Sequence, residues 1–224
     1  SSRLMSRHAK AEIAAMTTHA DLLQAMNCNV IIFAEVTGCI HSEKDARLSQ
    51  RPRLRPDEWR TFGQRMTEVG KAAADKGLTL CYHHHMGTVV QSAADIDALM
   101  TETGDEVMLL LDSGHAFFAG ADPVQLARTY APRIGHVHCK DIREIVLQQS
   151  LNRDCSFLDA VLNGVFTVPG DGCIDYPAMF AELKKTNYDG WAVVEAEQDP
   201  SVANPFAYAS LGYQYLSGLV KTGS

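Results

Sequence analysis

Short apolar runs alternate with helical segments along the whole chain, and this alternation constrains the fold more than any other feature of the sequence. Six runs of mostly β-branched or aliphatic residues are predicted strands, at residues 29–36, 78–84, 107–114, 134–141, 164–170 and 190–197. Helices are predicted at residues 9–26, 56–77, 92–103, from 122 onward, 142–163, 176–186 and 203–219. Strands separated by helices are typical of βα units on a parallel sheet.

Each of the six predicted strands is followed by a helix, and one more helix precedes the first strand. A closed (βα)8 barrel needs eight such units. The sequence therefore predicts an α/β fold, a (βα)8 TIM barrel of which this chain covers six units with the first two strands missing, as one domain over residues 1–224. A complete open sheet of six strands is the alternative. No G-x-G-x-x-G follows a strand, so nothing indicates a dinucleotide-binding fold.

Composition limits the classes of partner. The chain has 224 residues, 46% hydrophobic and 21% charged, which is enough for one sizeable core. Its net charge of −7 argues against nucleic acid, and the absence of a run of about 18 apolar residues argues against a membrane span. The six cysteines form no CxxC pair, and the N-terminus lacks the apolar core of a signal peptide. We therefore expect a cytoplasmic protein.

Five of the predicted strands end in residues that bind metals or transfer protons. Because the carboxyl ends of parallel strands meet at one face of the sheet, these side chains should converge there. Side chains alternate along a strand, so His83 and His85 share a face and His84 points the other way, which predicts a structural role for His84. The residues at the five ends are Glu35; His83 and His85; Asp112 with His115; His136, His138 and Lys140; and Glu195 and Glu197.

A set of imidazoles and carboxylates indicates the kind of metal. Such nitrogen and oxygen donors suit Mn²⁺, Co²⁺, Fe²⁺ or Zn²⁺ better than a thiolate-preferring metal, and Mg²⁺ usually takes fewer imidazoles. Asp112 follows the apolar run "VMLLL", where a lone carboxylate is costly unless it is paired or bound to a metal. Between Glu195 and Glu197, the first should lie deeper, because it ends the run "WAVV".

Five motifs, "YHHHMGT", "LLLDSGH", "HVHCKDIR", "VPGDGCIDY" and "GWAVVEAEQDP", resemble the xylose-isomerase-like (βα)8 family and, within it, the dehydratases of inositol catabolism. The resemblance covers essentially the whole chain from the strand containing Glu35. It implies a divalent metal, Mn²⁺ or Co²⁺ first and Zn²⁺, Fe²⁺ or Mg²⁺ as alternatives. The implied ligands are His83, Asp112, His138 and Glu195. Many sugar epimerases of the family carry Glu at the position of His83, so His85 is the alternative first ligand.

The resemblance also implies a reaction. The substrate would be a small cyclic polyol ketone, 2-keto-myo-inositol (scyllo-inosose), which loses water through an enediolate to give a trihydroxycyclohexanedione. We expect Glu35 and Lys140 to carry protons, Lys140 with a pKa lowered by the nearby metal, and His115 and Arg143 to orient hydroxyls. A homo-oligomer is compatible with the sequence, which does not fix the number of subunits.

Other interpretations stay open at this point. A metal-dependent ketose epimerase or aldose–ketose isomerase would use the same enediolate. Metal-dependent endonucleases share the barrel, but the acidic charge speaks against them, and an inactive fragment is a third alternative. His115 could instead cap the following helix, Glu35 could pair with an arginine of the loop at residues 47–60, and that loop could be a lid or a solvated linker.

Overall fold

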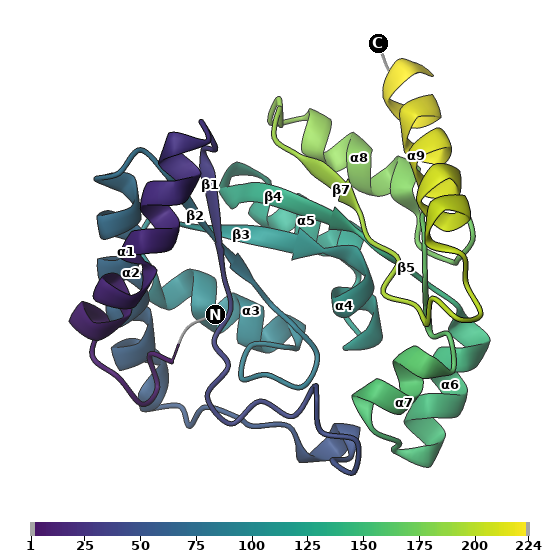
Figure 1. Ribbon diagram of the computed structural model, residues 1–224, viewed down its shortest axis with the longest axis horizontal. Helices are drawn as coiled ribbons and strands as arrows, with labels where there is room; N and C mark the ends of the chain where they lie inside the picture. The colour runs from purple at the N-terminus through teal and green to yellow at the C-terminus, as the bar shows by residue number, and fades with distance from the viewer. Residues whose placement is uncertain (1–2, 223–224) are drawn as a thin grey trace.

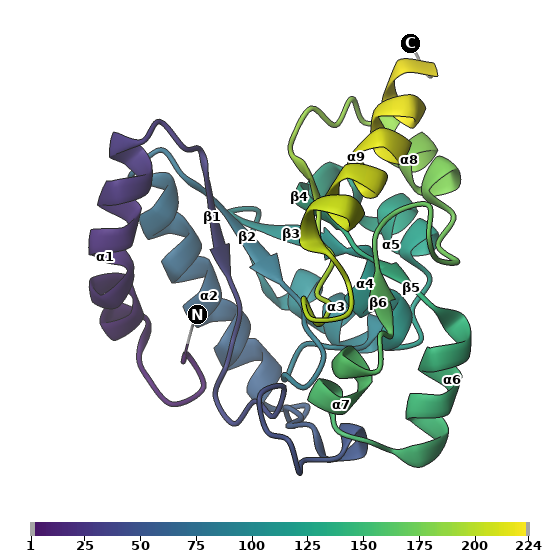
Figure 2. The ribbon, with the colours of Figure 1, turned by 45° about the vertical axis from the view of Figure 1, so that its right-hand side comes forward.

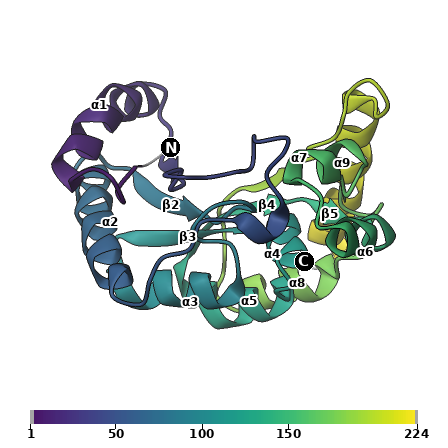
Figure 3. The same ribbon diagram turned by 90° about the horizontal axis from the view of Figure 1, so that it is seen from below.

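The computed structural model describes residues 3–222, and a five-stranded parallel sheet in the order β1-β2-β3-β4-β7 forms its centre (Figure 1). The sheet is curved. Figure 3 shows helices along its convex side, while the concave side faces the loop that follows β1. This is the predicted α/β architecture, an incomplete barrel. The strands of the sheet are β1 (Val30–Phe33), β2 (Thr79–His83), β3 (Val107–Asp112), β4 (Ile134–Cys139) and β7 (Ala192–Val194).

Nine α-helices and two 3-10 turns lie within the described residues. In Figure 2, α1 and α2 lie at one side of the sheet and α8 and α9 at the other. The bounds are α1 (Ala9–Ala25), η1 (Leu48–Gln50), α2 (Glu58–Ala74), α3 (Ala93–Glu102), α4 (Ser113–Phe118), α5 (Pro123–Tyr130), η2 (Ala131–Arg133), α6 (Glu144–Arg153), α7 (Phe157–Leu162), α8 (Tyr176–Lys184) and α9 (Pro205–Thr222). No helix within residues 3–222 combines the length and the apolar character that a membrane crossing needs.

One predicted strand does not join the sheet. Within residues 164–170, only β6 (Phe166–Thr167) is extended, and it pairs antiparallel with β5 (Asp141–Ile142), so β7 pairs directly with β4. The Arg143 guanidinium holds this segment, because it donates to the carbonyls of Gly164 at 3.0 Å and Phe166 at 3.1 Å. The sheet therefore has five strands rather than the predicted six, three fewer than an eight-stranded barrel.

Two helical predictions also differ from the structure. The segment at 142–163 is two helices, because Asp154 takes the left-handed conformation after α6 (φ +46°) and Ser156 caps α7 by accepting from the Asp159 amide. An additional helix, α4, starts directly after β3. Its N-cap is Asp112, whose Oδ1 accepts from the His115 amide at 2.9 Å. The carboxylate that ends β3 therefore caps α4 itself, and His115 does not supply the cap.

The register of the sheet sets the strand ends side by side. Asp112 is the partner of His138 across β3 and β4, and His83 pairs with Leu110 across β2 and β3. The middle of β3 is fully buried, because helices cover its outer face and neighbouring loops its inner one. Helices α2 and α3 approach closely at Gly63, where an added Cβ would lie 2.2 Å from the Glu102 carbonyl oxygen. The carboxyl ends of β2, β3 and β4 therefore lie side by side, and the polar residues that end these strands lie close together.

Candidate metal centre and active site

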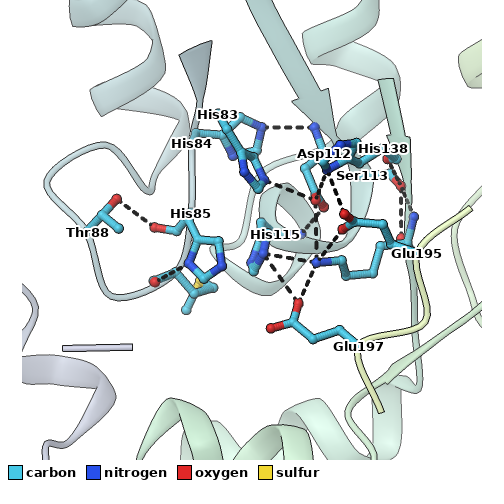
Figure 4. Close-up of polar contacts among 12 residues, drawn as sticks. His83, His84, His85, Thr88, Asp112, Ser113, His115, His138, Glu195 and Glu197 are labelled. Atoms are coloured by element: carbon cyan, nitrogen blue, oxygen red, sulfur yellow. Dashed lines mark hydrogen bonds and ion pairs between the residues drawn. The ribbon is translucent and has the colours of Figure 1, made fainter. Parts of the chain in front are cut away.

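His83, Asp112 and His138 meet at the carboxyl ends of β2, β3 and β4. Nε2 of His83 lies 3.3 Å from Oδ2 of Asp112, and Nδ1 of His138 lies 3.4 Å from the same oxygen. The three residues each offer a ligand atom within 4.8 Å of the others. Strands far apart in the sequence thus deliver three of the four predicted ligands to one point (Figure 4).

The fourth predicted ligand, Glu195, follows β7 and joins the same group. Its Oε1 lies 3.2 Å from Nδ1 of His138, and its Oε2 lies 2.9 Å from Nζ of Lys140. Contacts of 3.2 to 3.4 Å therefore connect all four predicted ligands, three of which lie on separate strands while the fourth directly follows β7. We call His83, Asp112, His138 and Glu195 the ligand group. Their binding of a metal stays a prediction.

A second group of possible ligands lies beside the first. His85, His115 and Glu197 each offer a ligand atom within 4.8 Å of the others, and we call them the outer group. The rings of His85 and His115 are 3.8 Å apart between centroids. Nδ1 of His85 lies 2.7 Å from the Met86 carbonyl oxygen, which fixes the proton on Nδ1 and leaves Nε2 as an acceptor. His85, the alternative first ligand, thus belongs to the outer group.

Lys140 lies between the two groups. Its Nζ is 3.1 Å from Nε2 of His115 and 3.5 Å from Oδ2 of Asp112, and it also forms an ion pair with Glu197. The pKa of Lys140 is raised although burial opposes its charge, because Asp112, Glu197 and Glu195 surround the ammonium. Three carboxylates thus outweigh desolvation in this environment, and a pKa lowered by a nearby metal stays a prediction. Lys140 is an ammonium here.

His84 has a structural contact, as strand parity predicts. It is fully buried, and its Nε2 accepts from the backbone amide of Asp112 at 3.2 Å. Burial lowers the pKa of His84 to about 3, so the ring is neutral. His136 lies beside His138 with 5.3 Å between ring centroids, and burial lowers its pKa to about 4. Neither ring is in the ligand group.

The carboxylates of the ligand group are ionised and His138 is protonated. Burial opposes the Asp112 carboxylate, yet Lys140 and the adjacent histidines hold its pKa well below the usual range. Burial likewise opposes the charge on His138, but contacts with Asp112 and Glu195 raise its pKa to about 9. Burial opposes the Glu195 carboxylate as well, and contacts with His138 and Lys140 still lower its pKa to about 2. Carboxylates thus stay ionised in a largely buried site.

The donor set of the ligand group fits a divalent metal. Two imidazoles and two carboxylates match the nitrogen and oxygen ligands of Mn²⁺, Co²⁺, Fe²⁺ and Zn²⁺. Asp112 is completely buried, and such a carboxylate is stable only when cations or donors surround it. His138 and Lys140 supply positive charge to it in this structure.

A cavity of about 360 Å³ opens directly on these residues, which is within the range of about 300–1,000 Å³ typical of small-molecule sites. Glu197 on its wall has a backbone φ of +41°, a left-handed conformation that a residue with a Cβ rarely adopts. Strain of this kind concentrates at functional sites. The cavity is lined by His83, His85, Lys140, Glu195, Ala196 and Glu197.

Two predicted catalytic residues have other partners. The Glu35 carboxylate is buried and accepts from the amides of Leu4 at 2.7 Å and Thr37 at 3.0 Å. Arg143 binds the β6 segment and forms an ion pair with Asp171 at 2.7 Å. The catalytic roles of both stay predictions.

The long loop between β1 and α2 is held in place by contacts near its middle. Ser49 donates from its amide to Asp154 at 2.9 Å, which joins the loop to the junction of α6 and α7 (Figure 1). Arg51 is almost fully buried and forms an ion pair with Asp95 at 2.7 Å. This arginine therefore anchors the loop.

Comparison with known proteins identifies relatives over nearly the whole chain. The profile of the xylose isomerase-like TIM barrel family matches residues 4–216. The chain is 46% identical over 215 residues to the rhizopine catabolism protein MocC of Rhizobium meliloti, covering 96% of this chain and 66% of that protein. It is 44% identical over 207 residues to an inosose dehydratase of Clostridium beijerinckii, covering 92% of this chain and 69% of that one. The chain thus spans about two thirds of these curated relatives.

Solved structures share the architecture at low sequence identity. A probable 3-DHS dehydratase, AsbF of Bacillus anthracis, superposes with a TM-score of 0.69 at 18% identity, over 95% of this chain and 72% of that one. The IOLI protein, solved with a bound zinc atom, superposes with a TM-score of 0.65 at 16% identity, over 94% of this chain and 69% of that one. At these identities the likeness extends to the fold alone.

Proposed function

The chain belongs to the xylose isomerase-like TIM barrel family, and from this premise we propose that it is a divalent-metal-dependent hydro-lyase acting on 2-keto-myo-inositol. The observation that carries the proposal is the continuous set of contacts joining His83, Asp112, His138 and Glu195 at one concave edge. The choice of substrate rests on the relatives named inosose dehydratase, which are 42–44% identical to this chain. The proposed product is a trihydroxycyclohexane-1,2-dione.

The ligand group would hold the metal, and Mn²⁺ or Co²⁺ suits its donors. When bound, a divalent metal supplies a Lewis acid that stabilises the negative charge of the enediolate. His138 must lose its proton before it can serve as a ligand, so metal binding should release protons. His84 positions Asp112, because its Nε2 accepts a hydrogen bond from the Asp112 backbone amide.

We assign the proton transfers to Glu197 and Lys140, which pair at the cavity wall. Glu197 lines the cavity, and burial raises the pKa of its carboxyl group. The carboxylate is therefore a stronger base than an exposed one. It would take the proton from the carbon next to the ketone, leaving the electron pair in the enediolate. This assignment replaces Glu35, whose carboxylate binds the Leu4 and Thr37 amides.

Water then leaves from the β-carbon. The enediolate electron pair forms the new double bond, the β-carbon–oxygen bond breaks, and the Lys140 ammonium gives its proton to the departing oxygen. The proton on Glu197 can then return to Lys140, because the two groups are in direct contact. Neutral His115 accepts a hydrogen bond from Lys140 and so orients the ammonium. Arg143 acts one step away, by fixing the β6 segment whose Phe166 ring lies under Lys140.

The test separates proton abstraction from water loss. The chain is loaded with Co²⁺ and incubated with 2-keto-myo-inositol in D₂O, with absorbance reporting the dione and NMR reporting deuterium at the α-carbon. We expect Glu197→Gln to lose exchange and dehydration together, and Lys140→Met to keep exchange while losing dehydration. Glu43→Gln, on the exposed loop after β1, serves as the control and should retain both.

Two results would contradict the proposal. A metal-loaded chain that leaves 2-keto-myo-inositol unchanged would exclude this substrate. A product that carries deuterium but lacks the dione absorbance would indicate an epimerase, which forms the enediolate without losing water.

A further inference from the structure

The hydroxyl of Ser113 joins the ends of β3 and β4 through the main chain. Ser113 is fully buried and directly follows Asp112. Its Oγ lies 2.9 Å from the carbonyl oxygen of Lys140 and 3.2 Å from that of His138, and it accepts from the Lys140 amide at 3.1 Å (Figure 4). The paired register of the two strands ends at Asp112 and His138. The Ser113 side chain therefore holds the part of the chain that lies beyond this last pair.

Tyr176 supplies the remaining hydrogen bond of this hydroxyl. It begins α8, is fully buried, and its hydroxyl oxygen lies 3.0 Å from Ser113 Oγ. A serine hydroxyl has one hydrogen to donate and two lone pairs. The Lys140 amide occupies one lone pair, and the hydrogen is directed to the nearer carbonyl, that of Lys140. Tyr176 is therefore the donor to the second lone pair, because a Ser113 hydrogen turned toward Tyr176 would be lost to both buried carbonyls.

Packing fixes the phenol ring that makes this contact. The rings of Phe180 and Tyr215 lie 6.4 Å and 6.2 Å from the Tyr176 ring between centroids. Helix α8 in turn packs along α5 on the convex side of the sheet. Tyr176 thus reaches the strand ends from a rigid element outside the sheet.

The position of the end of β4 decides several contacts of the site. His138 meets Asp112 at 3.4 Å, and Lys140 meets the same carboxylate at 3.5 Å. The Lys140 side chain also lies against the start of α4, because a Cβ added at Gly114 would be 2.7 Å from Lys140 Cγ. A shift of this end relative to β3 would move both side chains together, and a misplacement of about 1 Å can cost about 100-fold in rate.

We propose that Tyr176 is a positioning residue that acts through Ser113. Its hydroxyl fixes the end of β4 at the spacing from β3 at which His138 and Lys140 reach Asp112. Ser113 and Tyr176 lie in the motifs "LLLDSGH" and "VPGDGCIDY", and neither of them lines the cavity at the strand ends. The inference rests on the proposed function, because it presupposes metal binding by His138 and proton transfer by Lys140.

The test removes the two hydroxyls separately and together. Tyr176→Phe, Ser113→Ala and the double variant are measured for Co²⁺ affinity by calorimetry, for the visible d–d absorption of bound Co²⁺, and for kcat and KM with 2-keto-myo-inositol. We expect Tyr176→Phe to lower Co²⁺ affinity and kcat about 10-fold and Ser113→Ala to lower them about 10–100-fold, with a shifted d–d band in both. Because Tyr176 acts through Ser113, the double variant should match Ser113→Ala within about 2-fold.

Tyr188→Phe is the matched control. The Tyr188 hydroxyl also donates to a single acceptor, the Trp191 carbonyl at 2.8 Å, but near the amino ends of the strands. Its removal should leave Co²⁺ affinity, the d–d band and kcat unchanged, whatever its effect on urea unfolding. Circular dichroism shows whether each variant is folded. Tyr176→Phe keeps the packed ring and decides the question if the Ser113 variants do not fold.

The outcomes separate this inference from the proposed function. An active wild type together with a folded Tyr176→Phe of unchanged affinity, d–d band and kcat would overturn the inference alone. A double variant that loses the product of the two single effects would overturn it as well, because the hydroxyls would then act independently. A wild type that binds Co²⁺ but leaves 2-keto-myo-inositol unchanged would contradict the proposed substrate, and Co²⁺ affinity and the d–d band would still decide the inference. A wild type that binds no Co²⁺ would contradict the proposed metal centre and, with it, the inference.

Discussion

Acidification should destabilise the metal-free chain through His84. This ring is fully buried and neutral, and its Nε2 accepts from the Asp112 amide. Protonation would place a charge in an apolar environment and would abolish that acceptor. Burial lowers the pKa of His84 to about 3, whereas a histidine in an unfolded chain titrates at about 6.5. The folded state therefore resists taking up a proton that the unfolded state accepts.

The sign and the size follow from this difference. Above pH 6.5 the ring is neutral in both states, so its contribution to stability is fully present. Between pH 6.5 and pH 3 only the unfolded state binds the proton, and stability falls by about 1.4 kcal/mol per pH unit. From pH 7.5 to pH 5.0 the loss from His84 alone is about 2 kcal/mol. His85 and His115, whose pKa values burial also lowers, add to the total in the same direction.

The assay is urea unfolding of the chain in EDTA at pH 7.5 and pH 5.0, with His84→Gln beside the wild type. The glutamine oxygen can still accept from the Asp112 amide but does not titrate. We expect His84→Gln to lose about 2 kcal/mol less than the wild type over this pH range, whatever its stability at pH 7.5. His19→Gln, at an exposed position of α1, should lose as much as the wild type. Equal losses in wild type and His84→Gln would refute the argument that a neutral, buried His84 supports Asp112.

Three further predictions concern the ligand group and the packing around it. Asp112→Asn should lower Co²⁺ affinity about 100-fold or more, because a ligand charge is lost while the amide oxygen still caps α4, and calorimetry with circular dichroism measures both effects. Arg143→Lys should lower the free energy of unfolding, measured in urea, by about 2 kcal/mol, because an ammonium cannot replace a guanidinium that binds Gly164, Phe166 and Asp171 together. Lost turnover with an unchanged free energy of unfolding would instead support the predicted orienting role. Gly63→Ala should lower the free energy of unfolding by about 1–3 kcal/mol, because the added Cβ would lie 2.2 Å from the Glu102 carbonyl oxygen. Gly218→Ala is the control and should be neutral or slightly stabilising, because an added Cβ there meets no atom within 4 Å. Equal changes in the two variants would contradict this account.

The sequence predicted the parts of the fold that depend on local pattern. Continuous apolar runs identified every strand of the parallel sheet. The inner strands are apolar because they are buried on both faces, whereas the edge strands β1 and β7 are apolar although partly exposed. The run at 164–170 has the same character, yet it pairs with β5. That outcome depends on the Arg143 guanidinium, which binds carbonyls of residues far along the chain. Apolar pattern alone cannot reveal such a long-range contact.

The same distinction applies to the candidate site. His83, Asp112 and His138 end neighbouring strands whose register sets their side chains together, so strand ends and parity were sufficient to place them near one another. Glu35 also ends a strand, but β1 is at the edge of the sheet and its carboxylate is used by the Leu4 and Thr37 amides. The sequence pattern does not indicate the contact between Glu35 and the Leu4 amide, so the predicted catalytic role of Glu35 did not take this contact into account.

The outer group shows why the proton-transfer residues are harder to predict than the metal ligands. His85 and Glu197 lie beyond the ends of β2 and β7, where alternation no longer fixes the direction of a side chain. Glu197 reaches Lys140 from a left-handed backbone conformation that residues with a Cβ seldom take. The raised pKa of Lys140 in turn depends on three carboxylates from two other strand ends, and apolar pattern does not reveal those contacts. The regular sheet therefore positions His83, Asp112 and His138, whereas Glu195 and the outer group lie in the segments that follow the strands, and Lys140 contacts both groups.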